Sequence, residues 1–88
     1  MITVTLENQD QGDLFVTITD LNQAGDPEIL KRQRINQGES RLLDIQEDGN
    51  GRGRIKWLAQ RTDHPQKTAQ HVATPETGDT VGLTTFFG

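Results

Sequence analysis

The sequence predicts an all-β fold, either a single small antiparallel β-sandwich or a partly open β-barrel, with about six to seven short strands. Apolar and polar residues alternate along short segments, and clusters of turn-forming residues separate these segments about every 8–12 residues. No long apolar stripe at helical spacing is present. The chain has 88 residues, and because each domain typically needs ~100–200 residues, we expect residues 1–88 to form one all-β domain.

The alternation begins with the first residues of the chain. Ile2, Val4 and Leu6 point to one side of an expected strand at residues 2–7. Turn-forming residues follow, and a second alternating segment covers residues 14–21. We therefore expect these two strands to pair as a β-hairpin.

The rest of the chain continues the same pattern. Further strands are expected at residues 28–35, 41–46, 54–60, 70–75 and 79–87. The first of these carries basic side chains on one face. Between the fifth and sixth strands, the polar and proline-containing segment predicts a loop with at most a short helical turn.

The segment at residues 47–57 contains three glycines and joins the fourth and fifth expected strands. Asp48 and Asn50 match ligand positions of an EF-hand calcium loop. However, Arg52 stands where that loop needs an oxygen ligand, and Ala59 stands where it needs a glutamate. The Asp-Gly and Asn-Gly pairs instead favour the tight turn of a β-hairpin, and we expect no bound metal.

The same segment also permits an interpretation as a nucleic-acid contact, because basic residues gather around the only tryptophan, Trp57. These residues are Arg52, Arg54, Lys56 and Arg61. Basic side chains can contact phosphates while an aromatic ring stacks on a base. The alternative function is therefore a small β-barrel that binds single-stranded nucleic acid. A net charge of −4 argues against it, as does alternation that places Trp57 in the core.

Charge and cysteine content exclude several classes of function. All nine Lys and Arg residues lie between Lys31 and Lys67, whereas residues 1–30 contain acids and no base. Such blocks fit either oppositely charged strands within one fold or complementary faces of two subunits. The chain has no cysteine, which removes disulfides, thiolate catalysis and cysteine-bound metals. Without a signal-peptide pattern or a long apolar run, we expect a cytoplasmic protein with no membrane contact.

Catalytic chemistry has little support in the sequence. The only serine, Ser40, lies in a turn and not in a nucleophile elbow. His64 and His71 lie in a polar stretch, so a two-histidine metal site is a third hypothesis, but no HExxH spacing supports it. We therefore predict that the protein is not an enzyme and uses no cofactor.

The end of the chain carries two adjacent phenylalanines, Phe86 and Phe87, which a strand sends to opposite faces, so one of them needs cover. That cover is either a subunit or partner contact, or a sandwich that covers both faces of the strand. A domain this small also buries a modest fraction of its surface and gains from a partner. We predict a non-enzymatic protein interaction or assembly module that binds itself, as a homodimer or higher oligomer, or another protein. It would use an edge or C-terminal strand, with Leu83, Phe86 and Phe87 at the interface.

Overall fold

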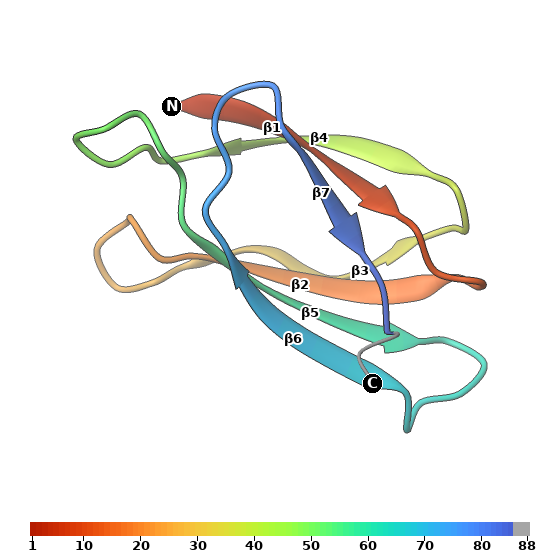
Figure 1. The fold of residues 1–88 in the computed structure, drawn as a ribbon. Helices are drawn as coiled ribbons and strands as arrows, with labels where there is room; N and C mark the ends of the chain where they lie inside the picture. Colours follow the sequence, from red (N-terminus) through yellow and green to blue (C-terminus); the bar gives the residue numbers. More distant parts are fainter. Residues whose placement is uncertain (86–88) are drawn as a thin grey trace.

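The computed structural model describes residues 1–85 and contains seven β-strands in two sheets (Figure 1). The strands are β1 (Ile2–Asn8), β2 (Leu14–Asp20), β3 (Glu28–Ile35), β4 (Ser40–Ile45), β5 (Ile55–Arg61), β6 (Thr68–Ala73) and β7 (Thr80–Leu83). No helix occurs within these residues. The predicted all-β class is confirmed, and of its two alternatives the sandwich is the one observed, because the sheets do not close into a barrel.

The two sheets are assembled from strands that are distant in the sequence. One sheet has the order β4-β1-β7, and the other has the order β3-β2-β5-β6. The strands pair antiparallel except β1 and β7, which run parallel, so the predicted antiparallel arrangement holds for all pairs but this one. The hairpin expected from the first two strands was wrong, because β1 and β2 belong to different sheets.

The core lies between the facing sides of the two sheets, where alternate residues of each strand meet. Its fully or nearly fully buried members are Val4, Leu6, Leu14, Val16, Ile18, Ile35, Ile45, Ile55, Trp57, Ala59, Ala69, Val81 and Leu83. Alternation along β5 directs Ile55, Trp57 and Ala59 inward, as the sequence predicts. Burial of these apolar side chains is the main favourable contribution to folding.

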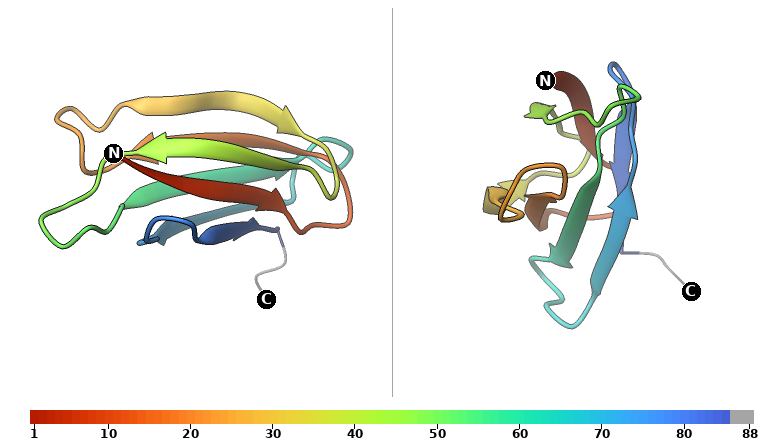
Figure 2. Two further views of the ribbon diagram at one scale, coloured as in Figure 1. Left: turned by 90° about the horizontal axis from the view of Figure 1, so that it is seen from above. Right: turned by 90° about the vertical axis from the view of Figure 1, so that its left-hand side faces the viewer.

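The segment at residues 47–57 contains a tight turn, but it does not form the predicted β4–β5 hairpin. The backbone N–H of Asp48 donates to Arg52 O at 2.7 Å, and Gly51 has a φ of 76°. The Asp48 carboxylate also accepts hydrogen bonds from the backbone N–H groups of Asn50 and Arg52. β4 and β5 nevertheless lie in different layers (Figure 2). Turn chemistry satisfies only local backbone angles, so it does not determine which sheet each flanking strand joins.

A buried carboxylate, that of Asp20, ties the two sheets together at this end of the sandwich. The Asp20 side chain, at the end of β2, is fully buried. It accepts hydrogen bonds from the backbone N–H groups of Asn22 and Gln46 and from Nε2 of Gln23. Since Gln46 directly follows β4, this carboxylate links the ends of strands from both sheets.

Close packing at Gly53 yields a prediction about stability. A Cβ at this position would lie 2.2 Å from Cδ1 of Ile45, a side chain that is fully buried. The substitution Gly53→Ala should therefore lower the free energy of unfolding by about 1–3 kcal/mol, measured by chemical denaturation. Gly49→Ala is the matched control, because a Cβ at Gly49 meets nothing within 4 Å. Equal stability of the two variants would contradict this account of the turn.

Candidate interaction site

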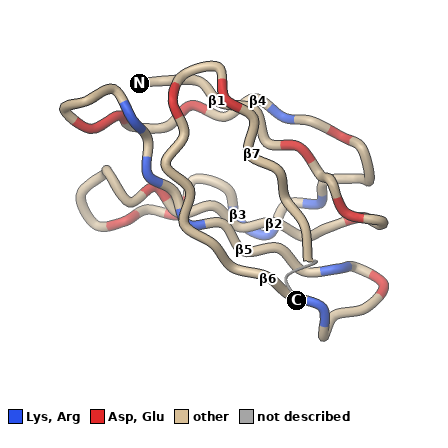
Figure 3. The backbone as a smooth tube through the Cα atoms, in the orientation of Figure 1, with Lys and Arg blue, Asp and Glu red and all other residues tan. Residues whose placement is uncertain are grey.

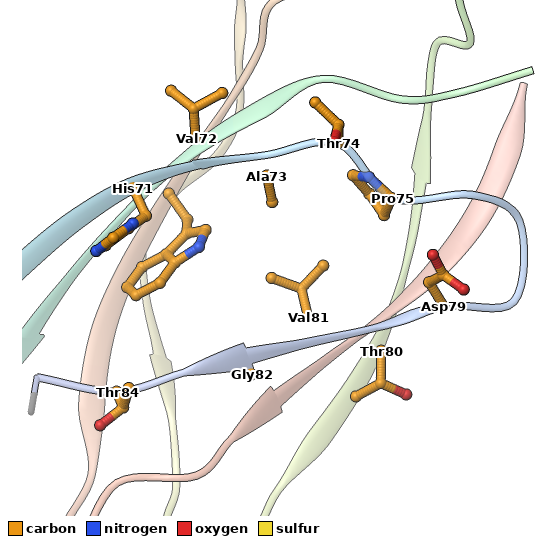
Figure 4. Close-up of a pocket in the computed structure, with 11 residues that line it drawn as sticks. His71, Val72, Ala73, Thr74, Pro75, Asp79, Thr80, Val81, Gly82 and Thr84 are labelled. Atoms are coloured by element: carbon orange, nitrogen blue, oxygen red, sulfur yellow. The ribbon is translucent and has the colours of Figure 1, made fainter. Parts of the chain in front are cut away.

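A pocket of about 430 Å³ lies between the edge strands β6 and β7 (Figure 4). The buried side chains of Trp57 and Val81 form its inner wall. The short connection between the two edge strands contributes Thr74, Pro75 and Asp79 to the lining. The pocket therefore occupies the side of the sandwich where neither sheet continues.

Trp57 and His71 form an aromatic pair at this pocket. They lie opposite each other in the β5–β6 ladder, with ring centroids 5.6 Å apart and an interplanar angle of 25°. Trp57 is only 4% exposed, which agrees with its predicted core position, whereas His71 is exposed. The imidazole thus extends the apolar wall of the pocket from the core to the surface.

The hydrogen-bonding direction of β6 can be derived from its pairing with β5. The backbone N–H of Arg61 donates to Lys67 O at 3.0 Å, although the N–H of Lys67 donates to His64 O, and beyond the other end of the ladder the N–H of Gly53 donates to Pro75 O at 2.8 Å. These bonds place the odd-numbered residues of β5 and β6 in the exchanging pairs of the antiparallel ladder, in which two opposite residues each donate to the other. Such pairs recur at every second residue. The intervening residues Thr68, Gln70 and Val72 therefore direct their backbone N–H and C=O groups away from β5. Within residues 1–85, no strand pairs with β6 on that side.

The four edge strands differ in how they are protected against pairing with another chain. Edge strands are commonly protected by charged side chains, bulges or short length. β3 carries Lys31, Arg32 and Arg34 and a register shift, with Arg32 at a φ of 44°. β4 carries charged residues of both signs, and β7 has only four residues. β6 has neither a Lys, Arg, Asp or Glu nor a bulge, so it is the least protected edge in the described structure.

A network of charged side chains fixes the end of β7. Asp10 is 4% exposed, and its carboxylate accepts a hydrogen bond from the backbone N–H of Thr85 at 2.8 Å and another from the Thr85 hydroxyl. Arg61 donates to Asp10 at 3.3 Å and also forms two hydrogen bonds with Asp63. The network joins the β1–β2 connection, the end of β5 and the residues after β7.

The titration of this network follows from its contacts. Burial alone raises the pKa of Asp10, but hydrogen bonds from Thr85 and Gln11 and the charge of Arg61 outweigh it and hold this pKa below its ordinary value. The hydrogen bond from Arg61 is the main cause that lowers the pKa of Asp63. The same contact raises the pKa of Arg61. The ionised forms of these groups are therefore favoured in the folded state.

Lys and Arg residues are interspersed with Asp and Glu along the chain (Figure 3). The four basic residues predicted to contact nucleic acid differ in burial and in their partners. Arg61 is buried, and its guanidinium group forms ion pairs with Asp10 and Asp63. Arg52 pairs with Glu76 at 2.8 Å. Arg54 is exposed, whereas Lys56 is partly buried on the outer face of the four-stranded sheet. Nucleic-acid binding by this set stays a prediction from sequence, and the described geometry supplies no additional support for it.

The predicted interface residues also differ in position. Leu83 is fully buried in the core, so in this fold its side chain offers no surface to a partner. Val81, two residues earlier in β7, lies on the same face of the strand, and both side chains point between the sheets. Phe86 and Phe87 lie outside the described residues.

The two histidines are placed on separate elements. His64 lies in the β5–β6 loop beside Asp63, at 3.2 Å, while His71 stacks on Trp57. In the described part of the chain, no group of three or more His, Cys, Asp or Glu side chains is arranged to hold a metal ion. The two-histidine hypothesis stays a prediction from the sequence.

Comparisons with known proteins do not extend this description. The chain matches no protein-family model, no curated protein and no solved structure. No helix in residues 1–85 has the length and apolar character needed to cross a membrane. The function must therefore be argued from the geometry of the site.

Sequence reasoning missed two features of this site. The absence of charge in residues 68–73 is visible in the sequence, but only the strand order shows that this segment lies at an edge. The role of Asp10 had no sequence signal, because aspartates near turns commonly bond to their own backbone. Its partners Arg61 and Thr85 are far away along the chain.

The Asp10 network yields a prediction that can be tested by pH. Asp10→Asn should lower the free energy of unfolding at neutral pH by about 1–3 kcal/mol, because Arg61 and Thr85 lose a buried ionised acceptor. The folded-state pKa of Asp10 is lowered, so its contribution is present above the unfolded value of about 3.9 and is lost as the pH falls through the folded value. The stability difference between wild type and variant should therefore shrink in acid.

Urea denaturation of both proteins between neutral and strongly acidic pH measures this difference. Asp26→Asn provides the matched control, because Asp26 is exposed in the turn after β2. A constant difference between wild type and Asp10→Asn across this range would show that the carboxylate charge does not stabilise the fold.

Proposed function

We propose that this protein is a non-enzymatic assembly module that associates with itself, or with another protein, by adding an extended strand to the outer edge of β6. The observation that carries the proposal is the combination of outward-directed backbone groups at Thr68, Gln70 and Val72 with the absence of charged residues in β6. Such an edge is a template for strand addition.

The adjacent pocket supports the same proposal. In strand addition, backbone hydrogen bonds supply affinity, and pockets for alternate side chains supply specificity. The pocket beside β6 is walled by Trp57 and Val81, so it suits an apolar or aromatic side chain. Val72, which is 51% exposed on the outer face of β6, adds apolar surface to the same strand.

The pocket offers little to support catalysis. Asp79 accepts a hydrogen bond from the backbone N–H of Glu76, and His71 stacks on Trp57, so each of these side chains has a structural role. Ser40, the only serine, begins β4 in the other sheet. These positions support the interaction proposal over an enzymatic one.

Phe86 and Phe87 form a second proposed contact in this interface. They follow Thr84, which lines the pocket, and Thr85, which Asp10 holds in place. The proposal rests on the apolar side chains of both phenylalanines and on their place in the sequence directly after Thr84 and Thr85.

Blocking the edge of β6 tests the proposal. Gln70→Pro removes a backbone N–H that points away from β5, so the β5–β6 ladder retains its hydrogen bonds while strand addition loses a donor. We expect the wild-type chain to associate equally at low and high salt, and Gln70→Pro to associate about tenfold more weakly. Light scattering after size exclusion measures the mass at each concentration.

The control for this experiment is His71→Pro. The N–H of His71 points towards β5, so this substitution should lower the unfolding midpoint, whereas Gln70→Pro should leave it nearly unchanged. Unaltered association of a folded Gln70→Pro variant would remove β6 as the contact edge.

The double substitution Phe86→Ser and Phe87→Ser tests the second contact. We expect weaker self-association, because apolar surface is removed from the interface, with little change in the unfolding midpoint. Sedimentation velocity over a range of concentrations measures the association. A double variant that associates like wild type would exclude both phenylalanines from the interface.

A further inference from the structure

We propose that β6 pairs antiparallel with β6 of a second copy around a two-fold axis at Gln70, so that the two four-stranded sheets become one continuous sheet. This inference rests on the proposed function and specifies its partner. Two-fold dimers are the commonest homo-oligomers, and their interface uses the same patch on both subunits.

The position of the axis follows from the hydrogen-bonding direction of β6. Within β6, Thr68, Gln70 and Val72 are the residues that direct backbone groups away from β5, so these three can exchange hydrogen bonds with an added strand. An axis at Gln70 places Gln70 opposite Gln70 of the second copy and Thr68 opposite Val72. All three outward positions of both copies then take part in exchanging pairs.

A neighbouring register uses the edge less completely. An axis at His71 would pair Gln70 with Val72 of the second copy and would place Thr68 opposite Thr74, which lies beyond the end of β6. The partner of Thr68 in each copy would then lie outside the regular strand. The register centred on Gln70 keeps every bond within Thr68–Ala73.

The side chains are compatible with this register. On the outer face, the two Gln70 amides meet and can hydrogen-bond to each other. Thr68 and Val72 form β-branched cross-strand pairs, which favour antiparallel sheets. Lys67, the nearest charged residue, would lie opposite Ala73 of the second copy, so no like charges meet. By contrast, pairing of β3 with its own copy would bring Arg32 and Arg34 close to equivalent cations.

The inner face also accommodates a second copy. Ala69 would lie opposite His71 of the second copy, and its small side chain leaves room for the imidazole. Because the pocket lies directly beside β6, the added strand would pass along its mouth. The added strand would therefore lie beside the apolar lining of the pocket.

A charge-swap experiment tests this register specifically. On a two-fold axis, residue 70 meets its own copy, so Q70K homodimers bring two cations together and Q70E homodimers bring two anions together. Each variant alone should associate about tenfold more weakly than wild type at low salt. An equimolar mixture should recover association as a one-to-one heterodimer, detected by native mass spectrometry and by sedimentation velocity.

The matched control uses the same charges at Gln37, which is exposed in the β3–β4 connection. Q37K and Q37E should associate like wild type, alone and mixed. Wild-type association of Q70K and Q70E alone, or no recovery in their mixture, would overturn the Gln70 axis.

Different results would contradict the Gln70 axis and strand addition at β6. Association that is lost in Gln70→Pro but kept in Q70K and Q70E overturns the axis and still supports strand addition at β6. A wild-type chain that stays monomeric at every concentration overturns the dimer. Association that persists in all three variants overturns both.

Discussion

The buried carboxylate of Asp10 holds the end of β7 in place, and much of the open side of the sandwich depends on it. Asp10 accepts hydrogen bonds from Thr85 and Arg61. At the opposite end of β2, Asp20 accepts hydrogen bonds from Gln46 and from Asn22 and Gln23, which follow Asp20 in the sequence. Buried carboxylates are tolerated only when hydrogen bonds satisfy them, so each fixes the segments that supply its donors. These two carboxylates thus link the sheets at both ends of the sandwich. Neither set of hydrogen bonds joins β6 to β7.

This arrangement leaves two edges beside one pocket. β7 pairs with β1 in one sheet, and β6 pairs with β5 in the other. Closing the gap would require the sheets to join into a barrel, but the pocket, with Trp57 and Val81 as its inner wall, separates the two edges. The apolar wall and the outward backbone groups of β6 therefore coexist on one surface, where a single extended segment can contact both.

The sequence predicted the individual strands well and their partners poorly. Alternation depends on which face of a strand is buried, so it located the strands and the inward position of Trp57. Pairing depends on contacts between distant segments, and turn residues are equally compatible with a hairpin and with a connection between sheets. The segment at residues 47–57 and the expected pairing of β1 with β2 failed for this reason. Leu83 was predicted to lie at an interface, and the alternation alone does not show that its side chain is buried between the two sheets.

Two basic residues of the middle segment pair with aspartates of the acidic first third within the same chain. Arg34 of the basic middle segment pairs with Asp13 of the acidic first third, and Arg61 pairs with Asp10. Of the two explanations for the charge blocks, pairing inside one fold is the one these contacts support. Because these opposite charges are neutralised internally and β6 carries none, association at β6 would depend on backbone hydrogen bonds and apolar contact. Salt weakens exposed charge pairs and leaves such contacts largely intact, so the response to salt separates an edge contact from association between the two charged segments.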